Sequence, residues 1–240
     1  MTIDFHMHIG EDIQNKTKAS LDDIERVMKN ARVKKAVLFC FNSREFLEES
    51  NKILQLSQKH SWIIPFLRFN PRTITPKQLT AELEKGYKGI KLHTSVQHFY
   101  PHDPKFTWIF KKIQKKKIPV LFHNHTSIHE PRGHPKYVLT LAKRFPKITF
   151  VIGHAAGGEE FQFEHISKIK NVYVETSLYS QHSFFESVYR DWKFDRFLFG
   201  SDFPFSLPEI EIMKINLARI PKELKRKILY KNAEKILRLR

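Results

Sequence analysis

The sequence predicts an α/β fold, a compact (β/α)8 TIM barrel that forms a single domain over residues 1–240. Eight short apolar runs alternate with amphipathic helical segments, which is the order expected of parallel βαβ units. No linker, repeat or low-complexity tract divides the chain. Glycine is scarce, at 8 residues, and the glycine-rich turn that a doubly wound open sheet normally carries after its first strand is missing. A closed barrel of right-handed units is therefore favoured.

The strand candidates are nearly continuous apolar runs, as strands buried on both faces should be. They are TIDFHMH (2–8), KAVLFC (35–40), IIPFLRF (63–69), GIKLH (89–93), PVLFHNH (119–125), ITFVIGH (148–154), VYVETS (172–177) and RFLFGSD (196–202). Eight parallel strands are the number that closes a barrel of this type.

Helix start signals precede several of the intervening segments. Ser20 is a predicted N-cap, and Asp23 stands three positions later as in a capping box. Thr75, followed by a proline, opens a helix that ends at Gly86, and Asp103 opens the next one by the same device. The remaining helical segments are HPKYVLTLAKRFP (134–146), EEFQFEHISKIK (159–170), FFESVYRDW (184–192) and KELKRKILYKNAEKILRL (222–239).

The composition limits the classes of function. The net charge is +17, but the basic residues are spread along the chain and mostly fall at helical spacing, which indicates solvated outer faces. A nucleic-acid partner is therefore disfavoured. No segment has the roughly 18 apolar residues that a membrane span needs, and no secretory signal is evident, so we expect a cytoplasmic protein without a membrane partner. The single Cys40 lies in an apolar run and is expected in the core.

Polar side chains gather at the ends of the predicted strands, where a barrel of this type places its reactive groups. They are His6, His8, Arg68, Lys91, His93, His123, His154 and Asp202. Because side chains alternate along a strand with a period of two, His6 and His8 share one face and Met7 takes the other. If that face points into the barrel, both imidazoles converge on its axis.

Five of these residues are of the types that bind divalent metals. They are His6, His8, His123, His154 and Asp202. A catalytic metal with an open position lowers the pKa of bound water from about 15.7 to about 7. Asp202 can then accept a proton as a catalytic base. His154 can bind a metal or act on the substrate as an acid, base or electrostatic partner.

The same residues resemble those of a known family. A His-x-His pair on the first strand, histidines on the fifth and sixth and an aspartate on the eighth are similar to the metal-dependent amidohydrolase superfamily. The segments GIKLH (89–93), FVIGHAAGG (150–158), NVYVETS (171–177), FLFGSDFP (197–204) and ILYKNAEKIL (228–237) resemble its amidohydrolase-related branch, which includes aminocarboxymuconate-semialdehyde decarboxylase. The resemblance covers the whole chain and implies a metal-dependent enzyme with this fold.

The resemblance also implies roles for single residues. In decarboxylase-like members, the matching positions make His6, His8, His123 and Asp202 the ligands of one metal, and His154 a catalytic residue. In dinuclear members, a carboxylated lysine on the fourth strand bridges two metals, and Lys91 occupies that strand. One ion is favoured and two are allowed, with zinc as the expected metal.

Three residues are expected to bind the substrate, namely Arg68, Lys91 and His93. The two cations favour a small anionic molecule as the substrate.

We expect a hydrolase that cleaves an ester, lactone or amide bond, or a closely related non-oxidative decarboxylase. A homo-oligomer is allowed. The alternative is a metal nuclease similar to the TatD type, and the positive net charge of the chain favours this alternative. Such nucleases usually carry a carboxylate on the fourth strand, where this chain has Lys91. A barrel without catalysis is a third, less favoured hypothesis.

Overall fold

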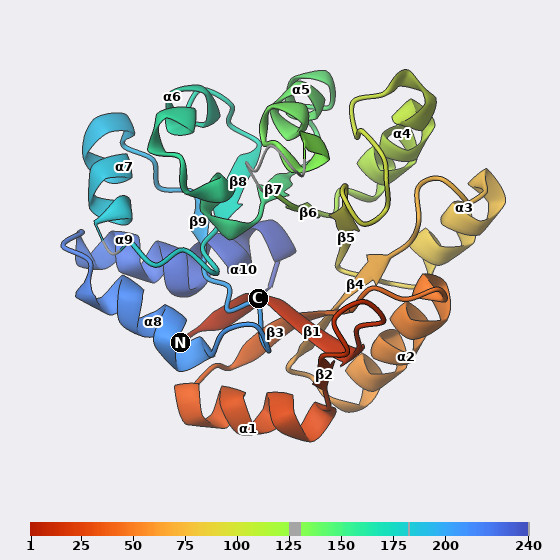
Figure 1. The fold of residues 1–240 in the computed structure, drawn as a ribbon, viewed down its shortest axis with the longest axis horizontal. Helices are drawn as coiled ribbons and strands as arrows, with labels where there is room; N and C mark the ends of the chain where they lie inside the picture. Colours follow the sequence, from red (N-terminus) through yellow and green to blue (C-terminus); the bar gives the residue numbers. More distant parts are fainter. Residues whose placement is uncertain (125–130, 182, 240) are drawn as a thin grey trace.

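The strands form one curled sheet that is surrounded by helices (Figure 1). The computed structural model describes residues 1–124, 131–181 and 183–239. The strands are β1 (Ile3–Glu11), β2 (Lys18–Ala19), β3 (Lys35–Cys40), β4 (Ile63–Arg68), β5 (Gly89–His93), β6 (Val120–His123), β7 (Phe150–Ile152), β8 (Val172–Glu175) and β9 (Phe197–Leu198). Their order is β2-β1-β3-β4-β5-β6-β7-β8-β9, and all neighbours except β1 and β2 are parallel.

The sheet closes between β1 and the segment that follows β9. The amide of Phe5 donates to the carbonyl of Phe199 at 2.8 Å, and the amide of His8 donates to the carbonyl of Phe203 at 2.9 Å. A parallel bridge joins Met7 to Phe203. The parallel strands therefore complete a barrel, and the predicted TIM-barrel fold is confirmed.

Helices follow the strands and pack around the barrel. They are α1 (Leu21–Ala31), α2 (Phe46–Lys59), α3 (Pro76–Glu84), α4 (Thr107–Lys116), α5 (Lys136–Arg144), α6 (Phe163–Ile166), α7 (Phe184–Trp192), α8 (Pro208–Leu217), α9 (Lys222–Arg226) and α10 (Asn232–Leu237). The predicted caps are present: Ser20 and Asp23 form a reciprocal capping box, and the hydroxyl of Thr75 accepts from the amide of Gln78. None of the described helices is long and apolar enough to cross a membrane.

Several elements differ from the prediction. The short strand β2 was not expected, and it forms an antiparallel pair with the end of β1. The segment 159–170 is helical only in short pieces, a 3-10 turn over Glu160–Gln162 and helix α6, and left-handed backbone at Ala155 and Ala156 precedes it. Strand β6 was predicted to reach His125 but ends at His123; Asn124 is not part of it, and His125 lies outside the described residues.

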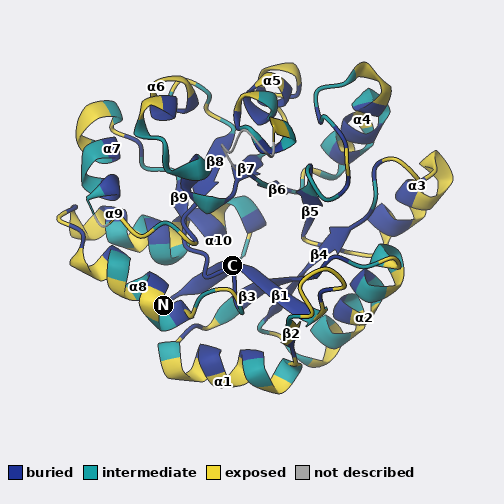
Figure 2. Ribbon diagram, in the orientation of Figure 1, coloured by how far each residue is buried: buried dark blue, intermediate teal, exposed yellow. Residues whose placement is uncertain are grey.

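The buried residues lie in two layers, inside the barrel and between the barrel and its helices (Figure 2). Side chains such as Ile3, Phe5 and Val37 fill the amino-terminal half of the barrel, and Ala233 and Leu237 of α10 cover that end. The apolar filling therefore leaves the polar strand ends of the other half facing a separate space. This is the half in which a barrel enzyme carries its active site.

Candidate active site

The two histidines of β1 face the inside of the barrel, as their spacing predicts. His6 is fully buried and His8 nearly so, while Met7 packs into the outer apolar layer. The Nε2 atom of His6 lies 2.9 Å from Oδ1 of Asp202, and the Nε2 atom of His8 lies 3.0 Å from the same oxygen. Residues 194 positions apart in the chain thus meet at one carboxylate oxygen.

The position of Asp202 depends on a departure from regular strand structure. Strand β9 ends at Leu198, four residues earlier than predicted. The amide of Asp202 donates to the carbonyl of His6 at 2.7 Å, and the residue has a φ of 58°. This left-handed backbone, which Asp tolerates better than most residues, turns the carboxylate toward the two imidazoles. Such strain typically costs about 1–3 kcal/mol and is common at functional sites.

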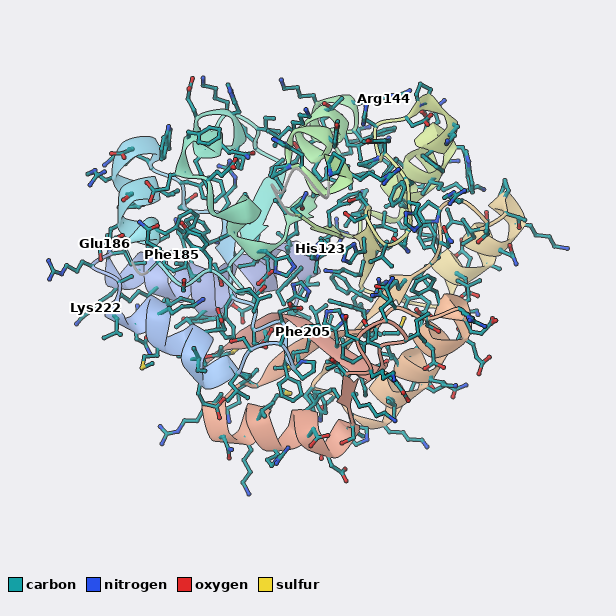
Figure 3. The ribbon with its side chains drawn as sticks, viewed as in Figure 1. His123, Arg144, Phe185, Glu186, Phe205 and Lys222 are labelled. Atoms are coloured by element: carbon teal, nitrogen blue, oxygen red, sulfur yellow. The ribbon has the colours of Figure 1, made fainter. Side chains whose placement is uncertain are left out.

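His154 has the same kind of backbone, with a φ of 53°, two residues after the end of β7. Its Nε2 lies 2.9 Å from Nδ1 of His123, and its ring centroid lies 5.0 Å from that of His6. His123 in turn stacks on His93, with centroids 3.7 Å apart and planes at 11°. Figure 3 shows His123 toward the middle of the ring of strands. Contacts of this kind link all the predicted ligands into one cluster.

Glu175 orients two of these histidines, and its role could not be decided from the sequence. The carboxylate is fully buried at the end of β8, and its Oε2 accepts from Nδ1 of His6 at 2.8 Å. The hydroxyl of Ser177 donates to Oε2 at 3.0 Å and lies 2.9 Å from Nδ1 of His154. A Cβ at Gly200 would lie 2.1 Å from Oε1, so this glycine leaves room for the carboxylate.

These hydrogen bonds determine which ring nitrogens are free to bind a cation. Because Nδ1 of His6 donates to Glu175, its Nε2 carries the lone pair. Because the Ser177 hydroxyl donates to Glu175, it accepts from Nδ1 of His154, so the lone pair of His154 is on Nε2, the nitrogen that faces Nδ1 of His123. A carboxylate that holds a histidine through its second nitrogen is the usual arrangement behind a metal ligand.

The site has a donor set that fits a divalent metal. Within the described part of the chain, His6, His154 and Asp202 each offer one ligand atom, and these atoms lie within 4.8 Å of one another. Two imidazole lone pairs and a carboxylate oxygen repel one another unless a proton or a cation lies between them. His8 and His123 touch members of this group but are not part of it. The close group therefore differs from the four ligands that the resemblance implies, since it contains His154.

The charge states of the group also suit a cation. Burial alone would raise the pKa of Asp202, but His6 and the hydrogen bonds from His6 and His8 lower it well below its usual range. Burial lowers the pKa of His8 to about 3 and that of His154 to about 4, despite the nearby Asp202. Burial and Lys91 lower the pKa of His6, but Asp202 and Glu175 outweigh them and raise it. A metal cation would compete with a proton for Nε2 of His6, because a histidine must be neutral to bind a metal.

Two buried cations lie beside this group without a carboxylate partner. Lys91 Nζ lies 3.0 Å from Nε2 of His6, and burial lowers its pKa to about 7 despite the charge of Asp202. The guanidinium of Arg68 donates to the carbonyl of Cys40 at 2.9 Å and to the amide oxygen of Asn42. Among the described residues, no carboxylate lies within 4.0 Å of either cation. Unpaired buried charges are rare in structural roles because of their desolvation cost.

A cavity of about 210 Å³ joins the cluster to the two cations. It is lined by His8, Asp12, Asn15, Asn42, Arg68, Lys91, His93, His123, Leu178, Asp202 and Phe205. All three residues expected to bind substrate line this cavity, whereas His6 and His154 are not among its lining residues. Planar rings form much of the lining, since Phe205 packs edge-on against His8 at 5.7 Å and His93 stacks on His123. The cavity therefore offers a flat, partly apolar space beside charged groups.

Comparison with known proteins identifies the family. The model of a family described as amidohydrolase matches residues 3–239. The chain belongs to the amidohydrolase family. A search of curated proteins finds no match for this amidohydrolase. Its family membership makes it an enzyme of the amidohydrolase superfamily, and the predicted resemblance to this superfamily is confirmed.

Solved structures similar to the amidohydrolase include several decarboxylases. The 5-carboxyvanillate decarboxylase of Sphingomonas paucimobilis matches with a TM-score of 0.77 and 15% identity over 99% of this chain and 98% of that one. The 2,6-dihydroxybenzoate decarboxylase of Rhizobium gives a TM-score of 0.79 and 16% identity, with 99% and 98% covered. Dihydroxybenzoic acid decarboxylase of Polaromonas, with bound manganese and the inhibitor 2-nitroresorcinol, gives 0.78 and 15%, with 99% and 97% covered.

The donor group of the site supports a divalent metal but not specifically the expected zinc. The identities are low, so the likeness by itself concerns the fold. Manganese is the metal in the structure from Polaromonas. The donor group of His6, His154 and Asp202 fits a divalent ion and does not select between manganese and zinc. The identity and the number of metal ions stay predictions.

Proposed function

We propose that this amidohydrolase removes carbon dioxide, without redox chemistry, from a small aromatic carboxylic acid in a metal-dependent reaction. One observation carries the proposal: Arg68 and Lys91, two buried cations that have no carboxylate partner among the described residues, line the same cavity as the carboxylate of Asp202. An anionic group of the substrate would supply the missing partner of these cations. The similar aromatic-acid decarboxylases support the choice of reaction.

The size and the walls of the cavity favour a single aromatic ring. A protein cavity of about 150 Å³ binds benzene, so about 210 Å³ leaves room for a ring with a carboxylate. Phe205 and Leu178 offer apolar contacts, and the ring of His93 lies flat against His123. Planar side chains of this kind stack well on a planar ligand.

The side chains of this site have complementary tasks in such a reaction. The bond between the ring carbon and the carboxyl group breaks, the electron pair stays on carbon, carbon dioxide leaves and a proton replaces it. When bound, a divalent cation would supply positive charge that stabilises the negative charge developing on the substrate. Arg68 would bind an anionic group of the substrate with its guanidinium. Asp202, which is ionised at rest, would take a proton from a substrate hydroxyl and return it to the carbon.

Hydrolysis of an ester, lactone or amide of similar size is the second candidate. The ionised state of Asp202 favours it, because hydrolysis needs a base next to the attacking water. The nuclease alternative has weaker support, since the fourth parallel strand of the barrel offers Lys91 and a cavity of about 210 Å³ is small for a polynucleotide.

A substrate panel with defined metals tests these reactions. The protein is loaded with Mn²⁺ or Zn²⁺ and assayed with hydroxylated benzoic acids, aryl esters, lactones and DNA. We expect release of carbon dioxide from a hydroxybenzoic acid, and loss of that activity after chelation and in His8→Ala. The matched control His165→Ala changes an exposed histidine on α6 and should keep activity. Ester or lactone cleavage without decarboxylation would replace the proposal with the second candidate, and cleavage of DNA alone would reject both.

A further inference from the structure

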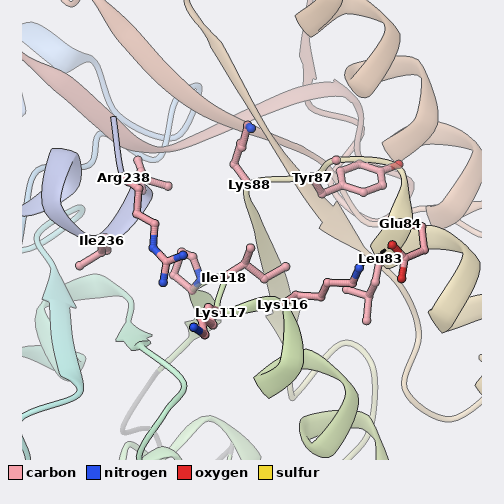
Figure 4. A pocket seen from close by; sticks show the side chains of 12 residues that line it. Leu83, Glu84, Tyr87, Lys88, Lys116, Lys117, Ile118, Ile236 and Arg238 are labelled. Carbon is pink, nitrogen blue, oxygen red and sulfur yellow. Dashed lines mark ion pairs between the residues drawn. The ribbon is translucent and has the colours of Figure 1, made fainter. Parts of the chain in front are cut away.

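Two adjoining cavities lie at the amino-terminal end of the barrel, opposite the active site. Their volumes are about 390 and 510 Å³, and they share Lys117, Ile236 and Arg238 as lining residues. We call them the basal cavities. They are formed where the chain enters β5, β6 and β7 and where α10 ends. Figure 4 shows the first of them, with Lys116 paired to Glu84 on one side and Lys117 and Arg238 toward the other.

The basal cavities concentrate positive charge. The basic residues that line them are Lys88, Lys116, Lys117, Lys147, Lys235 and Arg238. The one lining carboxylate is Glu84, which lies 2.6 Å from Lys116, so the 17 lining residues carry an excess of five positive charges. At the chain's average of +17 over 240 residues, the same number of residues would carry about one. None of the other five cations has a carboxylate within 4.0 Å in the described ranges.

Helix dipoles do not account for this excess. Helices α3, α4 and α10 end at these cavities, and basic residues are common near the negative end of a helix. Each helix end contributes about half a negative charge, so three of them offset about 1.5 of the five positive charges. The positive charges that are not offset repel one another, which destabilises the folded protein in the absence of a counter-ion. An anionic ligand would remove this cost.

Neutral hydrogen-bonding groups in the second cavity also suit an anion. Gln114, Thr149 and Tyr173 line it together with four basic residues and no carboxylate. The ring of Tyr173 is buried in the inner layer of the barrel, and its hydroxyl has no hydrogen-bond partner among the described residues. Amide and hydroxyl donors beside several cations are the combination that binds phosphate oxygens.

We propose that the basal cavities bind a small anion with two or more phosphate groups, separately from the active site. The cations line concave walls instead of a flat stripe, which favours a compact ligand over a polynucleotide. Tyr173, the aromatic residue of the second cavity, is 5% exposed and cannot serve as a platform on which bases stack. The proposal is independent of the reaction at the other end of the barrel.

Calorimetric titration of the metal-loaded protein with tripolyphosphate, pyrophosphate and orthophosphate tests the site. We expect saturable binding that strengthens with the number of phosphates and weakens with added salt. The double variant Lys117→Glu with Arg238→Glu changes two residues shared by both cavities, and its affinity for tripolyphosphate should fall at least tenfold.

The control is a double variant with the same change in net charge, Lys77→Glu with Lys111→Glu, at exposed positions of α3 and α4 outside the cavities. Its affinity should stay within threefold of the parent. Equal losses in both double variants would show attraction by net charge alone and overturn the proposal. If Arg68→Met lost affinity for tripolyphosphate and Lys117→Glu with Arg238→Glu did not, the anion would bind in the active site, and the proposal would also be overturned. If single-stranded DNA bound more tightly than tripolyphosphate, and if Lys117→Glu with Arg238→Glu weakened that binding, the ligand would be a polynucleotide and not a small anion.

Discussion

Glu175 and His6, which are 169 positions apart in the chain, are joined by a fully buried hydrogen bond of 2.8 Å. Through Ser177, the same carboxylate also holds His154. Two members of the close donor group are thus oriented by one acidic side chain that does not belong to the group. The affinity of the site for a metal should therefore depend on Glu175 as well as on the ligands themselves.

We expect Glu175→Gln to weaken metal binding by about 10- to 100-fold, the effect typical of residues that orient metal ligands. The carboxylate accepts from Nδ1 of His6, from the amide and hydroxyl of Ser177 and from the amide of His154. A glutamine offers one acceptor oxygen, so some of these donors lose their partner. Competition titration with a chromophoric chelator measures the change for Mn²⁺ and Zn²⁺.

Two further variants separate orientation of ligands from general effects of the substitution. Ser177→Ala removes the link to His154 and keeps the bond to His6, so its loss should be smaller than that of Glu175→Gln. Glu25→Gln on the exposed side of α1 should leave the affinity unchanged. An affinity that survives in Glu175→Gln would mean that the histidines hold their orientation without this carboxylate.

Much of this site could be predicted from the sequence because it follows from strand periodicity. His6 and His8 must share a face if the run 2–8 is a strand, and the carboxyl ends of parallel strands must meet at one mouth of a barrel. Glu175 could not be assigned in this way, since VYVETS is apolar on both faces apart from its end. Its importance comes from a hydrogen bond across the barrel, which no local pattern encodes.

The parts of the fold that were not predicted are those where the chain leaves regular structure. The side chain of Asp202 is oriented by a left-handed backbone that follows β9, a strand that ends earlier than predicted. The side chain of His154 is oriented by the same backbone conformation after β7. Propensity disfavours both conformations for residues other than glycine, so a pattern-based prediction extends the strands through them. The short strand β2 was missed for a related reason, because a pair of two residues has no periodicity.

Lys91→Met should stabilise the metal-free protein by on the order of a few kcal/mol at pH 7. Burial lowers the pKa of Lys91 from 10.5 to about 7, and every tenfold loss of proton affinity on folding corresponds to about 1.4 kcal/mol. Between these two values the unfolded chain binds more protons than the folded one, so the stability of the parent rises with pH. The penalty is full below about pH 7 and fades toward pH 10.5, and the advantage of Lys91→Met should fade with it.

Denaturant titrations at several pH values measure this difference. Lys77→Met at an exposed position of α3 is the matched control, and we expect it to stay within about 0.5 kcal/mol of the parent. If Lys91→Met were less stable than the parent at pH 7, the contact of Lys91 with His6 would be worth more than the cost of burying the ammonium.

Cys40 should resist thiol reagents as long as the protein is folded. The residue is 2% exposed and its thiol lies beside Ser50, and burial raises the pKa of the thiol to about 11 despite the nearby Arg68. The reactive thiolate is therefore scarce and inaccessible near pH 8. Labelling by a chromogenic disulfide reagent should follow the rate of opening, and protein in guanidinium chloride should react at once with one equivalent. Fast labelling under native conditions would show that the space between β3 and α2 opens without global unfolding.

Arg68→Met should raise KM for an anionic substrate by about 10- to 100-fold while changing kcat less. A hydrogen bond to a charged group contributes about 1.5–3 kcal/mol, which corresponds to a change of this size in KM. Hydrogen bonds to Cys40 and Asn42 hold the guanidinium of Arg68 in place. Arg68 is the one arginine among the lining residues of the cavity, so no other guanidinium there can replace it. Arg68→Lys keeps the charge but not the two parallel donors, so its KM should lie between those of Arg68→Met and the parent. A neutral analogue that lacks the substrate's anionic group should bind the parent and Arg68→Met alike. If Arg68→Met instead lowered kcat for acid and neutral analogue equally, with KM unchanged, Arg68 would support the structure of the site and would not bind the substrate.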